Sequence, residues 1–159
     1  MSEDLIIDKK ASKKDRYEQL LPQLKSLIEG ESNLLANQAN FCAAIKEAFD
    51  FLWIGFYHVI DDELVLGTFQ GPVACTRIKK GRGVCGSAWE KREAIIVEDV
   101  DAFPGHIACS SASKSEIVIP IFDKEGNVEA VFDVDDSELN RFDEIDKEFL
   151  TSMLSLLEK

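Results

Sequence analysis

The spacing of apolar side chains along the chain predicts helices at both ends and strands between them. Over residues 17–28 and 34–49 the apolar positions recur every three or four residues, which predicts two amphipathic helices. Asp15 is the expected N-cap of the first, and Gly30 ends it. The same spacing over residues 142–157 predicts a closing helix.

The middle of the chain follows a strand-like pattern instead. Residues 51–60 are aromatic and β-branched, and an acidic turn separates them from residues 64–69, which predicts a hairpin. Further strands are expected at residues 94–97, 116–122 and 128–134, a short strand or an extended loop at 73–78, and a short helix over 83–91. Strands paired as hairpins predict an α+β fold, an antiparallel sheet with the N- and C-terminal helices on one face. The irregular segment 99–113 is then expected to roof a pocket on the other face.

The length and charge of the chain restrict its domain organisation and the partners it can bind. The 159 residues predict one domain over residues 15–159, preceded by a flexible polar tail over residues 1–14. A net charge of -12 argues against a nucleic-acid partner. No apolar run approaches the roughly 18 residues of a membrane span. The start of the chain lacks the apolar core of a signal peptide, so we expect a cytoplasmic protein.

Four cysteines carry the first sign of chemistry. Cys75, Cys85 and Cys109 lie in polar, glycine-rich segments, whereas Cys42 lies on an apolar helix and is expected to be core filler. Several cations, four of them between residues 77 and 82, lie near the first three in sequence, and cations lower the pKa of a thiol. The pattern predicts thiol redox chemistry. No Cys-x-x-Cys or His-x3-His pair occurs, so we predict no metal site.

Three carboxylates are candidates for acid–base work. Asp133 and Asp135 are two apart on a predicted strand, so both side chains point to one face, and Glu116 opens the neighbouring strand. Three carboxylates facing one pocket repel one another, and at least one keeps its proton near neutral pH. The alternatives are that Asp135 belongs to a charged turn and that Glu116 is a plain strand-edge charge.

Two aromatic residues are candidates for a substrate-binding wall. Trp53 and Tyr57 are four apart on a strand and therefore share a face. Core packing is the alternative for both.

Several segments together resemble the free methionine-(R)-sulfoxide reductases, a family with the GAF fold. They are Trp53–Tyr57, Leu66–Gly71, Ala74-Cys75, Gly81–Gly86, Val97–Val100, Phe103–Cys109, Ser113–Val118 and Asp133–Asp135. The resemblance covers roughly residues 34 to 157, and the run ending Gly105-His106-Ile107-Ala108-Cys109 is its most specific part.

The resemblance implies a substrate, free L-methionine (R)-sulfoxide, and roles for the cysteines. Cys109 is the implied nucleophile, which becomes a sulfenic acid. Cys75 is the implied resolving thiol, and Cys85 is the rival for either role. No bound cofactor is implied, and thioredoxin is the implied electron donor that reduces the resulting disulfide.

The resemblance also gives roles to the carboxylates and suggests an assembly. A protonated member of the set Glu116, Asp133 and Asp135 would serve the sulfoxide oxygen as general acid, and ionised members would hold the substrate ammonium. The stripe on residues 17–28 is a candidate surface for a homodimer. Two non-enzymatic alternatives remain, a GAF sensor of a small ligand and a thiol sensor of oxidants.

Overall fold

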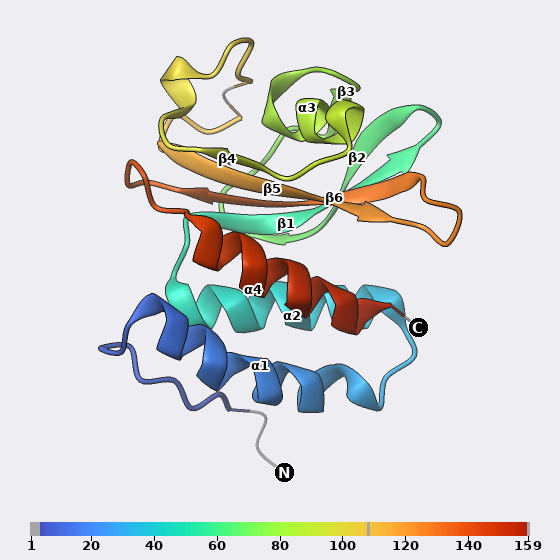
Figure 1. Cartoon of the computed structure of the whole chain (residues 1–159). Helices are drawn as coiled ribbons and strands as arrows, with labels where there is room; N and C mark the ends of the chain where they lie inside the picture. Colours follow the sequence, from blue (N-terminus) through green and yellow to red (C-terminus); the bar gives the residue numbers. More distant parts are fainter. Residues whose placement is uncertain (1–3, 108, 159) are drawn as a thin grey trace.

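A computed structural model describes residues 4–107 and 109–158, and its centre is a six-stranded antiparallel sheet in the order β3-β2-β1-β6-β5-β4 (Figure 1). The strands are β1 (Trp53–Ile60), β2 (Glu63–Gln70), β3 (Arg77–Lys79), β4 (Ile95–Val97), β5 (Ser115–Phe122) and β6 (Val128–Asp136). The predicted α+β fold is confirmed.

Helices cover the two faces of the sheet differently. The α-helices are α1 (Lys13–Glu29), α2 (Leu34–Phe49), α3 (Gly83–Lys91) and α4 (Glu144–Leu154), with short 3-10 turns η1 (Val100–Ala102) and η2 (Ser155–Leu157). In Figure 1, α2 and α4 lie against one face and α1 forms a further layer beyond them. On the other face lie α3, η1 and the loop that follows η1. We call these three segments the roof.

The start of the chain differs from the prediction. α1 begins at Lys13 because the side chain of Ser12, not of Asp15, caps it by accepting a hydrogen bond from the Asp15 amide. Within the predicted tail, residues 4–11 lie along α1, and the amide of Ile6 donates to Gln23 Oε1 at 2.8 Å. Residues 1–3 of the predicted tail lie outside the described residues.

The apolar stripe of α1 packs against other helices of the same chain. Tyr17, Leu20, Leu24 and Ile28 are buried in the core that α1 shares with α2 and α4. These four side chains are therefore covered within the chain, whereas Leu21 and Leu27 of the stripe are only partly buried. A homodimer through this stripe stays a prediction.

The sheet separates two apolar cores. Strand alternation sends Phe56 and Phe132 toward the helices and Trp53 and Tyr57 toward the roof. Cys42 is buried in the helix-side core, which confirms it as core filler. Within the described residues, no helix is long and apolar enough to cross a membrane.

The length of β6 decides where the carboxylates lie. The strand continues to Asp136, so the alternative that Asp135 belongs to a charged turn is wrong. Asp135 stands opposite Glu116 on β5 and opposite Trp53 on β1. The register thus brings these three residues to one end of the roof-side face.

Candidate active site

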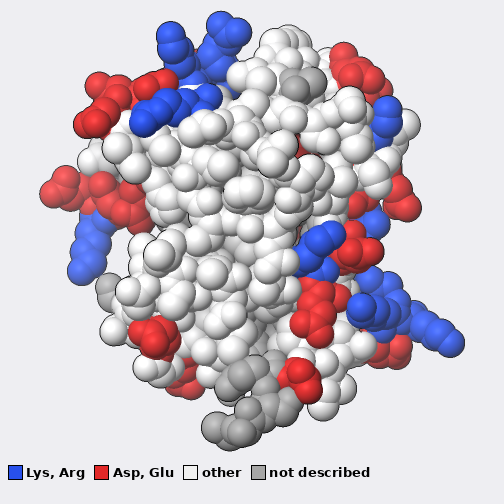
Figure 2. Space-filling view, turned by 180° about the vertical axis from the view of Figure 1, so that it is seen from behind, with Lys and Arg blue, Asp and Glu red and all other residues white. Residues whose placement is uncertain are grey.

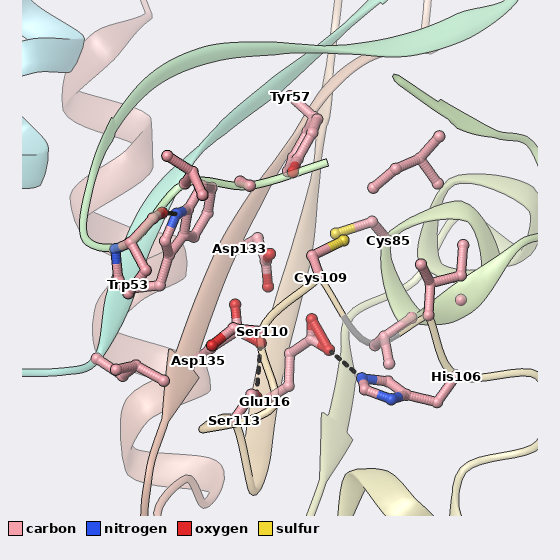
Figure 3. A pocket seen from close by; sticks show the side chains of 18 of the residues that line it. Trp53, Tyr57, Cys85, His106, Cys109, Ser110, Ser113, Glu116, Asp133 and Asp135 are labelled. Carbon is pink, nitrogen blue, oxygen red and sulfur yellow. Dashed lines mark hydrogen bonds and ion pairs between the residues drawn. The ribbon is translucent and has the colours of Figure 1, made fainter. Parts of the chain in front are cut away.

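A pocket lies between the sheet and the roof, and the predicted site residues meet in it (Figure 3). Its floor is built from β1, β5 and β6, and its cover from α3 and the loop after η1. The predicted residues in its lining are Trp53, Tyr57, Cys85, Cys109, Glu116, Asp133 and Asp135. Of the predicted set, Cys75 does not itself line the pocket but is bonded to Cys109, which does.

Trp53 and Tyr57 form one wall of the pocket. Their ring centroids are 5.9 Å apart, and both rings are held by backbone carbonyls: Trp53 Nε1 donates to Pro72 O at 3.1 Å and Tyr57 OH to Cys75 O at 2.9 Å. A Cβ on Gly55, between them on β1, would lie 2.6 Å from the Trp53 ring. Only glycine leaves room for the indole to lie flat over this strand.

Cys75 and Cys109 form a disulfide, and its Cys109 half lines the pocket. Their Cα atoms are 5.5 Å apart, although 34 positions separate them in sequence. Cys109 is exposed and Cys75 half-buried, so the pair can be reached from solvent. Cys85 has no disulfide partner and is 4% exposed.

The carboxylates of Glu116, Asp133 and Asp135 face one another. Glu116 and Asp133 are 5% and 6% exposed, and burial is the main cause that raises the pKa of all three carboxyls. The pKa values of Glu116 and Asp135 are further raised by the charge of Asp133. Hydrogen bonding from Glu116, Asp135 and Cys85 opposes the rise at Asp133. Because all of these hydrogen bonds favour its charged form, Asp133 is the member of the set that ionises first.

Two polar side chains from the loop before β5 complete the set. Ser113 Oγ donates to Asp135 Oδ1 at 3.1 Å, and His106 Nε2 lies 3.9 Å from Glu116 Oε1. Burial lowers the pKa of His106, which favours a neutral imidazole. The alternative that Glu116 is a plain strand-edge charge is wrong, since the carboxyl is buried among these partners.

Some lining residues could not be predicted from the sequence. Ser110 and Val73 line the pocket through loop positions that carry no periodic pattern.

The cations near the cysteines in sequence do not lower the pKa of the Cys85 thiol. Figure 2 shows Lys and Arg side chains gathered at the top of the molecule, the end where α3 and β3 lie in Figure 1. Arg77 pairs with Glu63 at 3.5 Å, and Lys80 lies over the Trp89 ring. For Cys85 the expectation of a lowered pKa is wrong: burial, and after it the nearby carboxylates, raise the pKa of its thiol.

Comparisons with known proteins agree with this geometry. A family model described as GAF domain matches residues 38–158. The chain is 59% identical over 159 residues to GAF domain-containing protein A of Dictyostelium discoideum, covering 99% of each chain. It is 43% identical over 149 residues to the free methionine-R-sulfoxide reductase of Escherichia coli, covering 93% of this chain and 90% of the relative.

Among solved structures, the free methionine-R-sulfoxide reductase from Neisseria meningitidis in complex with its substrate is 48% identical to this chain. The two superpose with a TM-score of 0.95, covering 99% of this chain and 94% of the other.

Proposed function

Since the chain belongs to the GAF domain family and, within it, to the free methionine-R-sulfoxide reductases, we propose how its pocket reduces free L-methionine (R)-sulfoxide. The observation that carries the assignment is the juxtaposition of a solvent-accessible cysteine pair with a cluster of carboxyl groups whose pKa values burial raises. A sensor needs the pocket but not this combination.

The substrate enters with its polar end toward the carboxylates. The Asp133 anion accepts the substrate ammonium, and Trp53 and Tyr57 receive the methylthio end against their rings. Free methionine sulfoxide carries an ammonium that the same side chain inside a protein lacks. A buried anion therefore selects the free amino acid.

Cys109 is the nucleophile in this proposal. Its thiolate attacks the sulfoxide sulfur while Glu116 or Asp135 donates a proton to the oxygen. The sulfur–oxygen bond of the substrate breaks as the oxygen, with this proton, forms a bond to the Cys109 sulfur, so methionine leaves and Cys109 becomes a sulfenic acid. The substrate sulfur gains two electrons, and the Cys109 sulfur loses them.

Cys75 resolves the sulfenic acid. Its thiol attacks the Cys109 sulfur, water leaves with the oxygen, and the Cys75–Cys109 disulfide forms. Thioredoxin then reduces this disulfide by thiol exchange and itself becomes oxidised. We place the reaction in the cytoplasm, where thioredoxin is kept reduced. A homodimer stays a prediction that light scattering tests.

The decisive experiment uses both epimers of free methionine sulfoxide. The reduced protein is incubated with the mixture and a small dithiol, and the products are separated by chiral chromatography. We expect loss of the R epimer alone, with one methionine formed per sulfoxide consumed. Survival of both epimers would favour a ligand sensor, and disulfide formation by peroxide without sulfoxide turnover would favour an oxidant sensor.

A further inference from the structure

A thiol and two carboxylates meet on the floor of the pocket with the spacing of a metal-ligand set. Cys85 Sγ, one oxygen of Glu116 and one oxygen of Asp133 all lie within 4.8 Å of one another, and all three residues are buried. They come from α3, β5 and β6, three elements fixed by the sheet and its packing. The proposed reaction gives Cys85 no part.

Asp133 gives a second sign that a cation belongs here. Although Glu116, Asp135 and Cys85 surround this carboxyl, its Oδ1 atom is buried and accepts no hydrogen bond of normal geometry among the residues that the structure describes. A buried polar atom left without a partner costs about 1–3 kcal/mol, and more when it carries charge. An oxygen of this kind, directed into a pocket, is suited to accept a cationic ligand.

We propose that Cys85, Glu116 and Asp133 bind a divalent cation of borderline softness, Zn²⁺ before others, in the reduced protein. Binding of the cation displaces the protons of the Cys85 thiol and the Glu116 carboxyl. The resulting thiolate and two carboxylate oxygens are a donor set that Zn²⁺ takes readily, whereas Mg²⁺ and Ca²⁺ prefer oxygen alone. Because Zn²⁺ binds ligands about 2.0–2.3 Å away, only a small contraction of the three side chains is needed. The sequence-based expectation of no metal site rested on cysteine and histidine spacing, which cannot detect donors from three separate elements.

Binding at this place has a consequence for the reaction. The cation occupies the Asp133 oxygen that is proposed to hold the substrate ammonium, so the two compete. Zn²⁺ thereby acts as a competitive inhibitor of the reduced enzyme. The competition rests on the proposed function, whereas the binding itself does not.

The binding test uses Co²⁺ as a spectroscopic probe for Zn²⁺. Reduced, metal-free protein is titrated with Co²⁺, and the near-ultraviolet thiolate-to-cobalt absorption band is followed. We expect one Co²⁺ per chain, displaced by Zn²⁺. The band should be lost in Cys85→Ser and Cys85→Ala and retained in Cys42→Ser, a matched control whose thiol lies in the other core. Circular dichroism checks that each variant is folded.

Two spectroscopic results would overturn the site. One is an unmodified protein that shows no thiolate band; the other is a band that survives in folded Cys85→Ala, which would place the thiolate ligand elsewhere.

Inhibition kinetics with Zn²⁺ test the metal site separately from the proposed reductase activity. We expect Zn²⁺ to raise the KM for free methionine sulfoxide and leave kcat unchanged, and the inhibition constant to weaken at least about tenfold in Cys85→Ser, a loss of about 1.4 kcal/mol. Inhibition of equal strength in that variant would refute the site. If the protein gives the cobalt band but consumes neither epimer, the metal-site proposal is supported and the proposed function is refuted.

Discussion

At the scale of the residue, the pocket concentrates groups whose chemistry depends on protons. Strand alternation sufficed to predict that Asp133 and Asp135 share a face, because successive side chains of a strand point to opposite sides. The sequence could not show that Glu116 stands opposite Asp135, since register between β5 and β6 is set by the whole sheet. Nor did spacing pair Cys75 with Cys109, because the loop that carries Cys109 has no period to follow.

The two paired cysteines should have separable effects on turnover. Cys109→Ser should abolish methionine formation, because it removes the attacking sulfur. Cys75→Ser should form about one methionine per chain and then stop when thioredoxin is the reductant. Rapid-quench measurement of methionine tests both.

The control for these variants is Cys42→Ser, whose thiol is far from the pocket and should leave turnover intact. Sustained thioredoxin-driven turnover in Cys109→Ser would contradict the assignment and make Cys85 the nucleophile.

Glu116 should make the protein less stable as pH rises. Its pKa is raised in the folded state, so above the usual pKa of a glutamate the unfolded chain releases a proton that the folded chain keeps. The free energy of unfolding then falls until the folded carboxyl also ionises. Glu116→Gln removes this penalty and should be more stable than the unmodified protein at pH 8, with the difference shrinking toward pH 4.

Urea unfolding of the oxidised proteins at several pH values measures this difference. Glu93→Gln, at an exposed position, is the matched control. A stability difference that does not change with pH would show that Glu116 is ionised in the folded protein.

At the scale of the element, α3 is the part of the roof that the sequence predicted best. Its glycine-rich start and its length over residues 83–91 are as expected, because a short apolar helix between polar loops has few alternative readings. The N-terminal helix was harder: Ser12 and Asp15 both have side chains suited to capping, and only the packed segment before α1 decides between them.

The contact between α3 and β3 should not tolerate an added methyl group. A Cβ on Gly86 would lie 2.5 Å from the carbonyl oxygen of Lys79, and backbone cannot move aside as a side chain can. Gly86→Ala should therefore destabilise the protein by about 1–3 kcal/mol. It should also lower kcat/KM, because α3 carries part of the pocket lining.

Thermal unfolding and steady-state kinetics test this prediction together. Gly30→Ala serves as the control, since a Cβ there meets nothing within 4 Å and stability should change by less than about 0.5 kcal/mol. Equal stability of the two variants would mean that α3 can shift on β3 without cost.

At the scale of the whole molecule, the redox state of the cysteine pair should set the resistance to unfolding. The disulfide joins residues 34 positions apart, and closing a loop of that length in the unfolded chain is worth about 4 kcal/mol. The oxidised protein should therefore melt at a higher temperature than the reduced protein. Calorimetry of both forms measures the difference, and Cys75→Ser should show none. Equal melting temperatures of the two forms would mean that strain in the folded state cancels the entropic gain.

The sheet also separates two sets of positions at which substitutions have different effects. One side holds the aromatic core and three of the helices, and the other holds the second core together with the pocket lining. Substitutions in the roof can change the pocket without weakening the helix-side core. Substitutions in the helix-side core can change the stability of the protein without altering the pocket lining. Such a chain can lose or gain a chemical activity while its lower half stays unchanged, and a single scaffold can therefore be inherited both by enzymes and by proteins that only bind.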